Sequence, residues 1–134
     1  KNSRVLRRYQ KDFPKNKLKS EDAFQELMKF FWLKQKLSFD KKTSSEENES
    51  LKFMCAIHQE MKEIDDMWHT FILFTKDYTD FCLHYFGNYI HHIPTDEEDE
   101  PIPLEQYEKE LTHFLSYIYD NLGEATIRKW FNEP

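Results

Sequence analysis

Only two glycines and five prolines interrupt this 134-residue chain, and this scarcity of turn residues restricts its fold more than any other feature. An all-β meander needs frequent turn residues between short strands, so that class of fold is disfavoured. Aromatic residues make up 16% of the chain. Because each aromatic side chain buries a large apolar area, a modest number of them can fill a core. We therefore expect a compact all-α bundle of about five or six helices.

Apolar residues recur at helical spacing along most of the chain. Ser20 is expected to cap a first long helix. Residues 39–49 are polar and without periodicity, which is typical of a loop. Ser50 then restarts a helical repeat that continues past Trp68 without a glycine or proline. The pattern thus predicts two long helices separated by a loop.

Helix boundaries are clearest in the second half of the chain. The hydroxyl of Thr75 can cap a new helix, so we predict that the chain breaks there and folds back as a helical hairpin. Gly87 is expected to end that helix, because glycine adopts the left-handed conformation without strain. After an acidic loop at 95–103, the spacing predicts a long helix that ends near Gly123, followed by a short terminal helix.

The charge of the chain is unevenly distributed. Residues 1–19 carry eight lysines and arginines against one acid, Asp12, which leaves 11 of the 19 basic and 24 of the 25 acidic residues for the remainder. We therefore divide the chain into a basic N-terminal arm (1–19) and a single helical domain (20–134). The arm can contact an anionic partner or the acidic face of its own domain. Nucleic acid is disfavoured as a partner, because phosphate neutralisation supplies most of that affinity.

The sequence shows no membrane or secretion signal. No apolar run approaches the roughly 18–20 residues that span a bilayer, and no apolar segment follows the basic N-terminus. We expect no membrane partner and a cytoplasmic location. Export or translocation to another cell stays open, because the chain begins with Lys1. Cys55 and Cys82 are too few for a disulfide framework and are expected to be reduced.

One stretch, residues 63–74, combines acids, an imidazole and large apolar groups more densely than any other. On a helix, Asp65 and His69 lie one turn apart, so the carboxylate can contact the imidazole. His91 and His92 supply further imidazoles. Because a straight helix would carry them far from His69, they approach it only if the predicted hairpin forms.

Three interpretations of this stretch compete. The first is a buried hydrogen-bond cluster that pins two helices and a loop together, with the expected members Asp65, Asp66, Trp68, His69, Thr75, Tyr78, Cys82 and His92. The second is a site for Zn²⁺ or Fe²⁺ with the expected ligands Asp65, His69, His91 and His92. The third is acid or base catalysis without a metal. The structural cluster is the preferred interpretation, so no cofactor is certain.

The same stretch carries a resemblance. From Asp65 to Cys82 the chain reads D-x-x-W-H-x-F-I-L-x-T-x-x-Y-x-x-F-C, and I-H-H-x-P follows at 90–94. This pattern resembles a group of small, mostly uncharacterised bacterial proteins, which are similar in turn to the glycine-rich domain-containing protein-like family of plants. Phe71 stands where the plant pattern often has a second histidine, and the glycine-rich tail is absent. The resemblance implies an all-helical domain with a Trp-His core.

For function we expect a non-enzymatic regulator or inhibitor that binds a partner enzyme in a bacterium. The reasons are the small size, the lack of a strong catalytic motif, and the surplus of apolar residues on the first long helix. The residues expected to bind another protein, or a second copy in a homodimer, are Phe30, Trp32 and Leu33. The alternative is a metal-binding domain, with catalysis left open, centred on His69 and His91 or His92.

Overall fold

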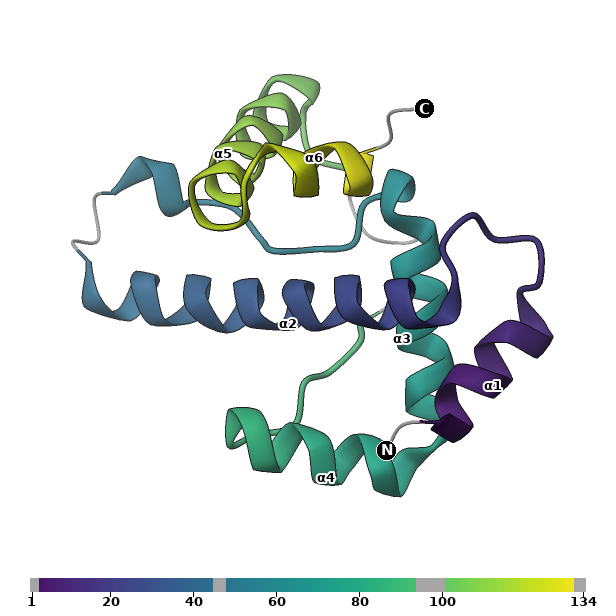
Figure 1. Ribbon diagram of the computed structural model, residues 1–134. Helices are drawn as coiled ribbons and strands as arrows, with labels where there is room; N and C mark the ends of the chain where they lie inside the picture. Colours follow the sequence, from purple (N-terminus) through teal and green to yellow (C-terminus); the bar gives the residue numbers. More distant parts are fainter. Residues whose placement is uncertain (1–2, 45–47, 94–100, 132–134) are drawn as a thin grey trace.

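A computed structural model describes residues 3–44, 48–93 and 101–131 (Figure 1). These residues form helices and no strand, which confirms the all-α fold. The elements are α1 (Ser3–Asp12), α2 (Ser20–Thr43), the 3-10 helices η1 (Glu49–Leu51) and η2 (Gln59–Met61), α3 (Lys62–Leu73), α4 (Thr75–Phe86), α5 (Leu104–Leu122) and α6 (Glu124–Phe131). No helix in the described part of the chain is both long and apolar enough to cross a membrane.

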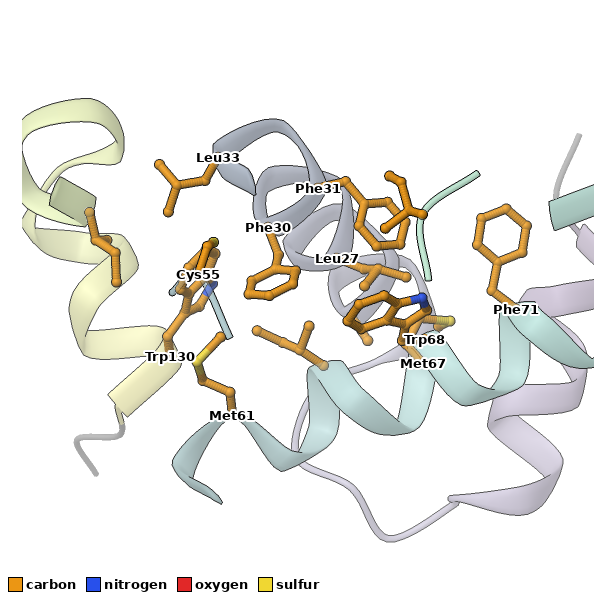
Figure 2. Close-up of a cluster of buried hydrophobic side chains, with 14 of the residues drawn as sticks. Leu27, Phe30, Phe31, Leu33, Cys55, Met61, Met67, Trp68, Phe71 and Trp130 are labelled. Atoms are coloured by element: carbon orange, nitrogen blue, oxygen red, sulfur yellow. The ribbon is translucent and has the colours of Figure 1, made fainter. Parts of the chain in front are cut away.

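Helix α2 lies at the centre of the fold, with α5 and α6 on one side and α4 on the other (Figure 1). A helix that is apolar around most of its circumference is buried on several sides. Phe30 packs between Trp68 and Trp130, at ring-centroid distances of 5.7 and 6.0 Å (Figure 2). The neighbouring Phe31 contacts α4 through Tyr78, at 6.3 Å. Two adjacent phenylalanines therefore join α2 to both sides of the molecule.

This central position corrects the expected partner-binding surface. Phe30 and Leu33 are 0% exposed, because both belong to the core around α2. Trp32 is 46% exposed and remains on the surface. Of the three residues, only Trp32 is therefore available to another protein.

Helix α2 continues to Thr43, so the predicted loop at 39–49 begins too early. Polar contacts hold the additional turn. Asp40 accepts hydrogen bonds from Lys36 Nζ at 2.7 Å and from the hydroxyl of Tyr117 at 2.5 Å. The start also differs by one residue, because Lys19 occupies the N-cap position and Ser20 is the first helical residue. Residues 45–47 lie outside the described part.

The helix predicted from Ser50 is wrong for its first half, because residues 52–58 are not helical. Phe53 and Cys55 are each 4% exposed, whereas Met54 between them is 71% exposed. This alternation is the period of an extended chain. Two lysines of α2 satisfy the segment's carbonyl groups: Lys41 Nζ donates to Phe53 O at 2.9 Å, and Lys34 Nζ donates to Cys55 O at 3.2 Å.

The predicted break near Thr75 is confirmed, and α3 and α4 meet there at a corner (Figure 1). Helix α3 ends at Leu73 and α4 begins at Thr75, with Phe74 as a non-helical junction at φ −95° and ψ 72°. Thr75 is exposed and caps nothing with its hydroxyl, so its expected role in the cluster is not found. Gly87 ends α4 with φ 77°, in the left-handed conformation that was predicted.

The basic N-terminal segment contains α1, which packs on α2 and α3. Val5 and Tyr9 are each 1% exposed, and they fasten one face of α1 to the core. After this helix, the backbone N–H groups of Lys17 and Leu18 donate to the carboxylate of Glu63 at 2.9 and 2.8 Å. The segment therefore contacts an acidic group at the start of α3.

Candidate metal centre

Three potential metal ligands converge beside α3. Asp65 and His69 lie one helical turn apart, and His69 Nε2 is 3.6 Å from Asp65 Oδ2. His92, which follows α4, places its Nε2 2.6 Å from Asp65 Oδ1. One carboxylate oxygen and two imidazole nitrogens all lie within 4.8 Å of one another. We call these three residues the Asp65–His69–His92 group.

A buried tyrosine holds the segment that carries His92. The hydroxyl of Tyr78 on α4 accepts a hydrogen bond from Trp68 Nε1 at 2.9 Å and donates one to Ile90 O at 2.5 Å. Burial raises the pKa of Tyr78, which keeps the hydroxyl proton available for that second bond. The ring of His92 then lies 4.3 Å from that of Trp68, measured between centroids. Tyr78 thus connects α3, α4 and the segment after Gly87.

The three side chains of the Asp65–His69–His92 group differ in their exposure to solvent. The side chain of His92 is 14% exposed and that of Asp65 is 24% exposed, whereas that of His69 is 56% exposed. All three side chains line a pocket of about 320 Å³. Asp65 and His92 are therefore mostly covered by the protein, whereas His69 is accessible to solvent, and all three can be reached from the pocket.

The donor set is typical of divalent transition metals. Imidazole nitrogen and carboxylate oxygen suit Zn²⁺ and Fe²⁺, and a carboxylate lowers the cost of placing a cation there. Three protein ligands leave coordination positions for other molecules. Without a metal, the same atoms can form a hydrogen-bonded Asp–His pair.

The model of a protein family described as UCP032817-like matches residues 2–113, which is most of the chain. The chain belongs to the UCP032817-like family. Membership in an uncharacterised family is thereby confirmed, whereas the similarity to the glycine-rich domain-containing protein-like family stays a prediction. No curated protein and no solved structure matches the chain.

His91 does not join the group in this UCP032817-like protein. Its ring is exposed and contacts that of Tyr89, at 4.8 Å between centroids, while it borders the pocket. Only His92 of the two places a ring nitrogen beside the carboxylate of Asp65. The structure therefore selects His92 from the predicted pair.

Two other residues of the predicted cluster, Asp66 and Cys82, lie outside the Asp65–His69–His92 group. Asp66 is 6% exposed on another face of α3, where it accepts hydrogen bonds from Asn16 Nδ2 at 3.0 Å and Lys62 Nζ at 3.1 Å. Cys82 is 0% exposed and adjoins Tyr78 in the core. Asp66 thus binds the N-terminal segment through Asn16. Cys82 packs in the core next to Tyr78.

His58 is a non-helical residue that immediately precedes η2. Its ring stacks on Phe114, at 5.3 Å between centroids, and burial lowers its pKa.

Two residues that sequence reasoning missed, Lys34 and Ile57, line the pocket beside the Asp65–His69–His92 group. Local sequence patterns do not mark them, because they come from α2 and from the extended segment that was predicted to be helical. Cys55 also lines the pocket, and its burial raises the pKa of the thiol to about 12.

Proposed function

We propose that this protein binds a divalent transition-metal ion, Zn²⁺ or Fe²⁺, through Asp65, His69 and His92. The observation that carries the proposal is the convergence of one carboxylate oxygen and two imidazole nitrogens within 4.8 Å at the wall of a pocket. These are the ligand types that both metals accept.

The exposure of the three side chains supports an adjustable site. Zinc ligands lie about 2.0–2.2 Å from the ion, so the donor atoms of a tetrahedral site are roughly 3.3–3.6 Å from one another. Asp65 and His92 are joined by a hydrogen bond of 2.6 Å, so the ion displaces the proton between them and the two atoms move slightly apart. Because the ring of His69 is more than half exposed, it can rotate toward them without disturbing the core. His69 is therefore the ligand that completes the site.

The position of the Asp65–His69–His92 group at a pocket supports a role for the metal in binding another molecule, in addition to stabilising the fold. Structural zinc sites are closed by four protein ligands, whereas sites that act on other molecules keep a position open. Here the open side faces the pocket. We infer that the metal is used to hold a small molecule there.

The expectation of a regulator or inhibitor that binds a partner enzyme has less support. One of its three reasons was the surplus of apolar residues on α2, and two of the residues expected to bind a partner, Phe30 and Leu33, are inside the core. The exposed Trp32 alone does not identify a partner. The metal proposal has three of its four predicted ligands in one place, so we prefer it.

Elemental analysis of protein purified without chelator or affinity tag tests the proposal. We expect about one equivalent of transition metal, or a rise in melting temperature when Zn²⁺ is added to metal-free protein. The changes His69→Ala, His92→Ala and Asp65→Asn should each abolish this binding. His91→Ala is the matched control, because His91 is a neighbouring imidazole outside the group, and it should leave binding intact.

Two results would contradict the proposal. One is less than about a tenth of an equivalent of metal together with no thermal shift on adding Zn²⁺ or Fe²⁺. The other is equal loss of binding in His91→Ala and His92→Ala, which would place the metal elsewhere.

A further inference from the structure

The pocket beside the Asp65–His69–His92 group contains one lysine, Lys34 of α2, among its described lining residues. Its ammonium group donates one hydrogen bond to Cys55 O at 3.2 Å. A lysine ammonium has three protons, so this bond leaves donors for a further acceptor. Lys34 is therefore a cationic group in the same pocket as the proposed metal site.

Lys34 differs from other lysines of α2 in its partner. Lys29 and Lys36 form ion pairs with Glu26 and Asp40, at 3.2 and 2.7 Å. Within the described residues no carboxylate lies within ion-pair distance of Lys34, which contacts a neutral carbonyl oxygen instead. Its positive charge is thus not neutralised locally.

The charges at the pocket favour an anion once the metal is present. Asp65 carries one negative charge, which offsets only half of the charge of a divalent ion. Lys34 adds one positive charge to the same pocket. Opposite charges attract strongly where water is partly excluded. An anionic oxygen can therefore bind the metal while a second oxygen of the same group accepts a hydrogen bond from Lys34.

The rest of the pocket is largely apolar. Phe30, Ile57 and Trp68 line its inner part, while Met54 and Ile93 are 71% and 82% exposed at its edge. Small-molecule sites commonly combine such apolar walls with a few polar groups that fix orientation. The volume of about 320 Å³ suits a small molecule. The walls thus match an apolar chain or ring attached to the anionic group.

From the shared placement of Lys34, the Asp65–His69–His92 group and the apolar walls, we infer that the ligand of this protein is a small organic carboxylate. One carboxylate oxygen binds the metal, the other faces Lys34, and the apolar part lies against Ile57 and Trp68. This inference rests on the proposed metal site.

The chain offers a matched control for Lys34. Lys41 lies on the same helix and likewise donates to a carbonyl of the extended segment, Phe53 O, at 2.9 Å. It lines the adjoining pocket of about 410 Å³ but not the pocket that contains the Asp65–His69–His92 group. Replacing either lysine removes a charge and a carbonyl contact, so only the effect on the ligand should differ.

The test uses the full chain loaded with Co²⁺, whose visible absorption reports on its ligands. Hexanoate, acetate, hexanol and inorganic phosphate are titrated separately. We expect saturable spectral changes with hexanoate and, more weakly, with acetate, and none with hexanol, which has the chain without the charge. Lys34→Met should weaken hexanoate binding about tenfold or more, as the loss of a charge-assisted hydrogen bond does, while Co²⁺ binding is unchanged. Lys41→Met should bind hexanoate as the unmodified protein does.

The outcomes separate the two proposals. If Co²⁺ binds but hexanoate does not, or if phosphate binds and the carboxylates do not, the carboxylate inference is wrong and the metal site stands. Equal weakening in Lys34→Met and Lys41→Met also overturns the inference. If no Co²⁺ binds, both proposals are wrong. Should Lys34→Met fail to fold, the comparison of hexanoate with hexanol on the unmodified protein decides the matter.

Discussion

His92 Nε2 lies 2.6 Å from Asp65 Oδ1, although 27 residues separate the two along the chain. The contact joins the helix that follows η2 to the segment that follows α4. It depends on the break at Phe74, where α3 ends and α4 begins, and on Tyr78, which holds Ile90 beside Trp68. The candidate metal site therefore forms because the helix breaks at Phe74 and the segment after Gly87 returns to α3.

Replacing His69 distinguishes a metal ligand from a structural element. Because its side chain is 56% exposed, His69→Ala should change the free energy of unfolding of metal-free protein by no more than about 0.5 kcal/mol, as surface substitutions do. Urea denaturation measures this. With Zn²⁺ at about 100 times its dissociation constant, the unmodified protein should gain about 2.7 kcal/mol and the variant nothing. A loss of several kcal/mol without metal would instead support the buried structural cluster.

Removing the hydroxyl of Tyr78 should affect both the fold and the metal. Tyr78→Phe leaves Trp68 Nε1 and Ile90 O without their partner, so we expect a loss of about 1–3 kcal/mol in stability. It should also weaken Zn²⁺ binding in calorimetry, because His92 loses the anchor of its segment. Tyr89→Phe is the control, since Tyr89 contacts the Tyr78 ring and is 38% exposed. If both variants bind Zn²⁺ equally well, Tyr78 does not position the site.

A buried carboxylate should prove essential for the contact between α2 and α6. Glu26 is 1% exposed and accepts a hydrogen bond from Trp130 Nε1 at 2.9 Å. Glu26→Leu leaves that buried N–H unsatisfied and should cost about 1–3 kcal/mol in thermal or urea unfolding. Glu26→Gln keeps an acceptor oxygen and loses only contacts to the half-exposed Lys29 and Lys129, so its cost should be smaller. Equal costs for the two variants would show that the Trp130 bond is not the main contribution.

His58 should make the fold less stable at acid pH. Burial against Phe114 lowers the pKa of His58 in the folded state, and the nearby charge of Glu60 opposes this only in part. The unfolded chain therefore binds more protons than the folded chain as the pH falls through about 6.5, and the free energy of unfolding decreases below that pH. His58→Phe should show a shallower decrease between about pH 7 and pH 5 in urea denaturation. Identical slopes for the two proteins would exclude this role for His58.

The helix boundaries show which sequence patterns were sufficient to predict where a helix begins or ends. Gly87 and Gly123 end α4 and α5 with positive φ, as their local chemistry predicted. The helix predicted over residues 52–58 does not form, because apolar residues at a spacing of three or four also occur by chance in a non-helical segment. This segment is instead held by contact with Lys34 and Lys41 of α2. A local pattern cannot report such a contact.

The sequence by itself determined the helical class of this protein, the break near Thr75 and the pairing of Asp65 with His69, because all three follow from spacing within a few residues. Only the tertiary structure decided that His92 and not His91 meets that pair, and that Lys34 lines the same pocket. The side to which each residue of an extended segment points depends on how that segment is anchored. Here the anchor is the bond between Tyr78 and Ile90 O, which forms only when α4 packs against α3.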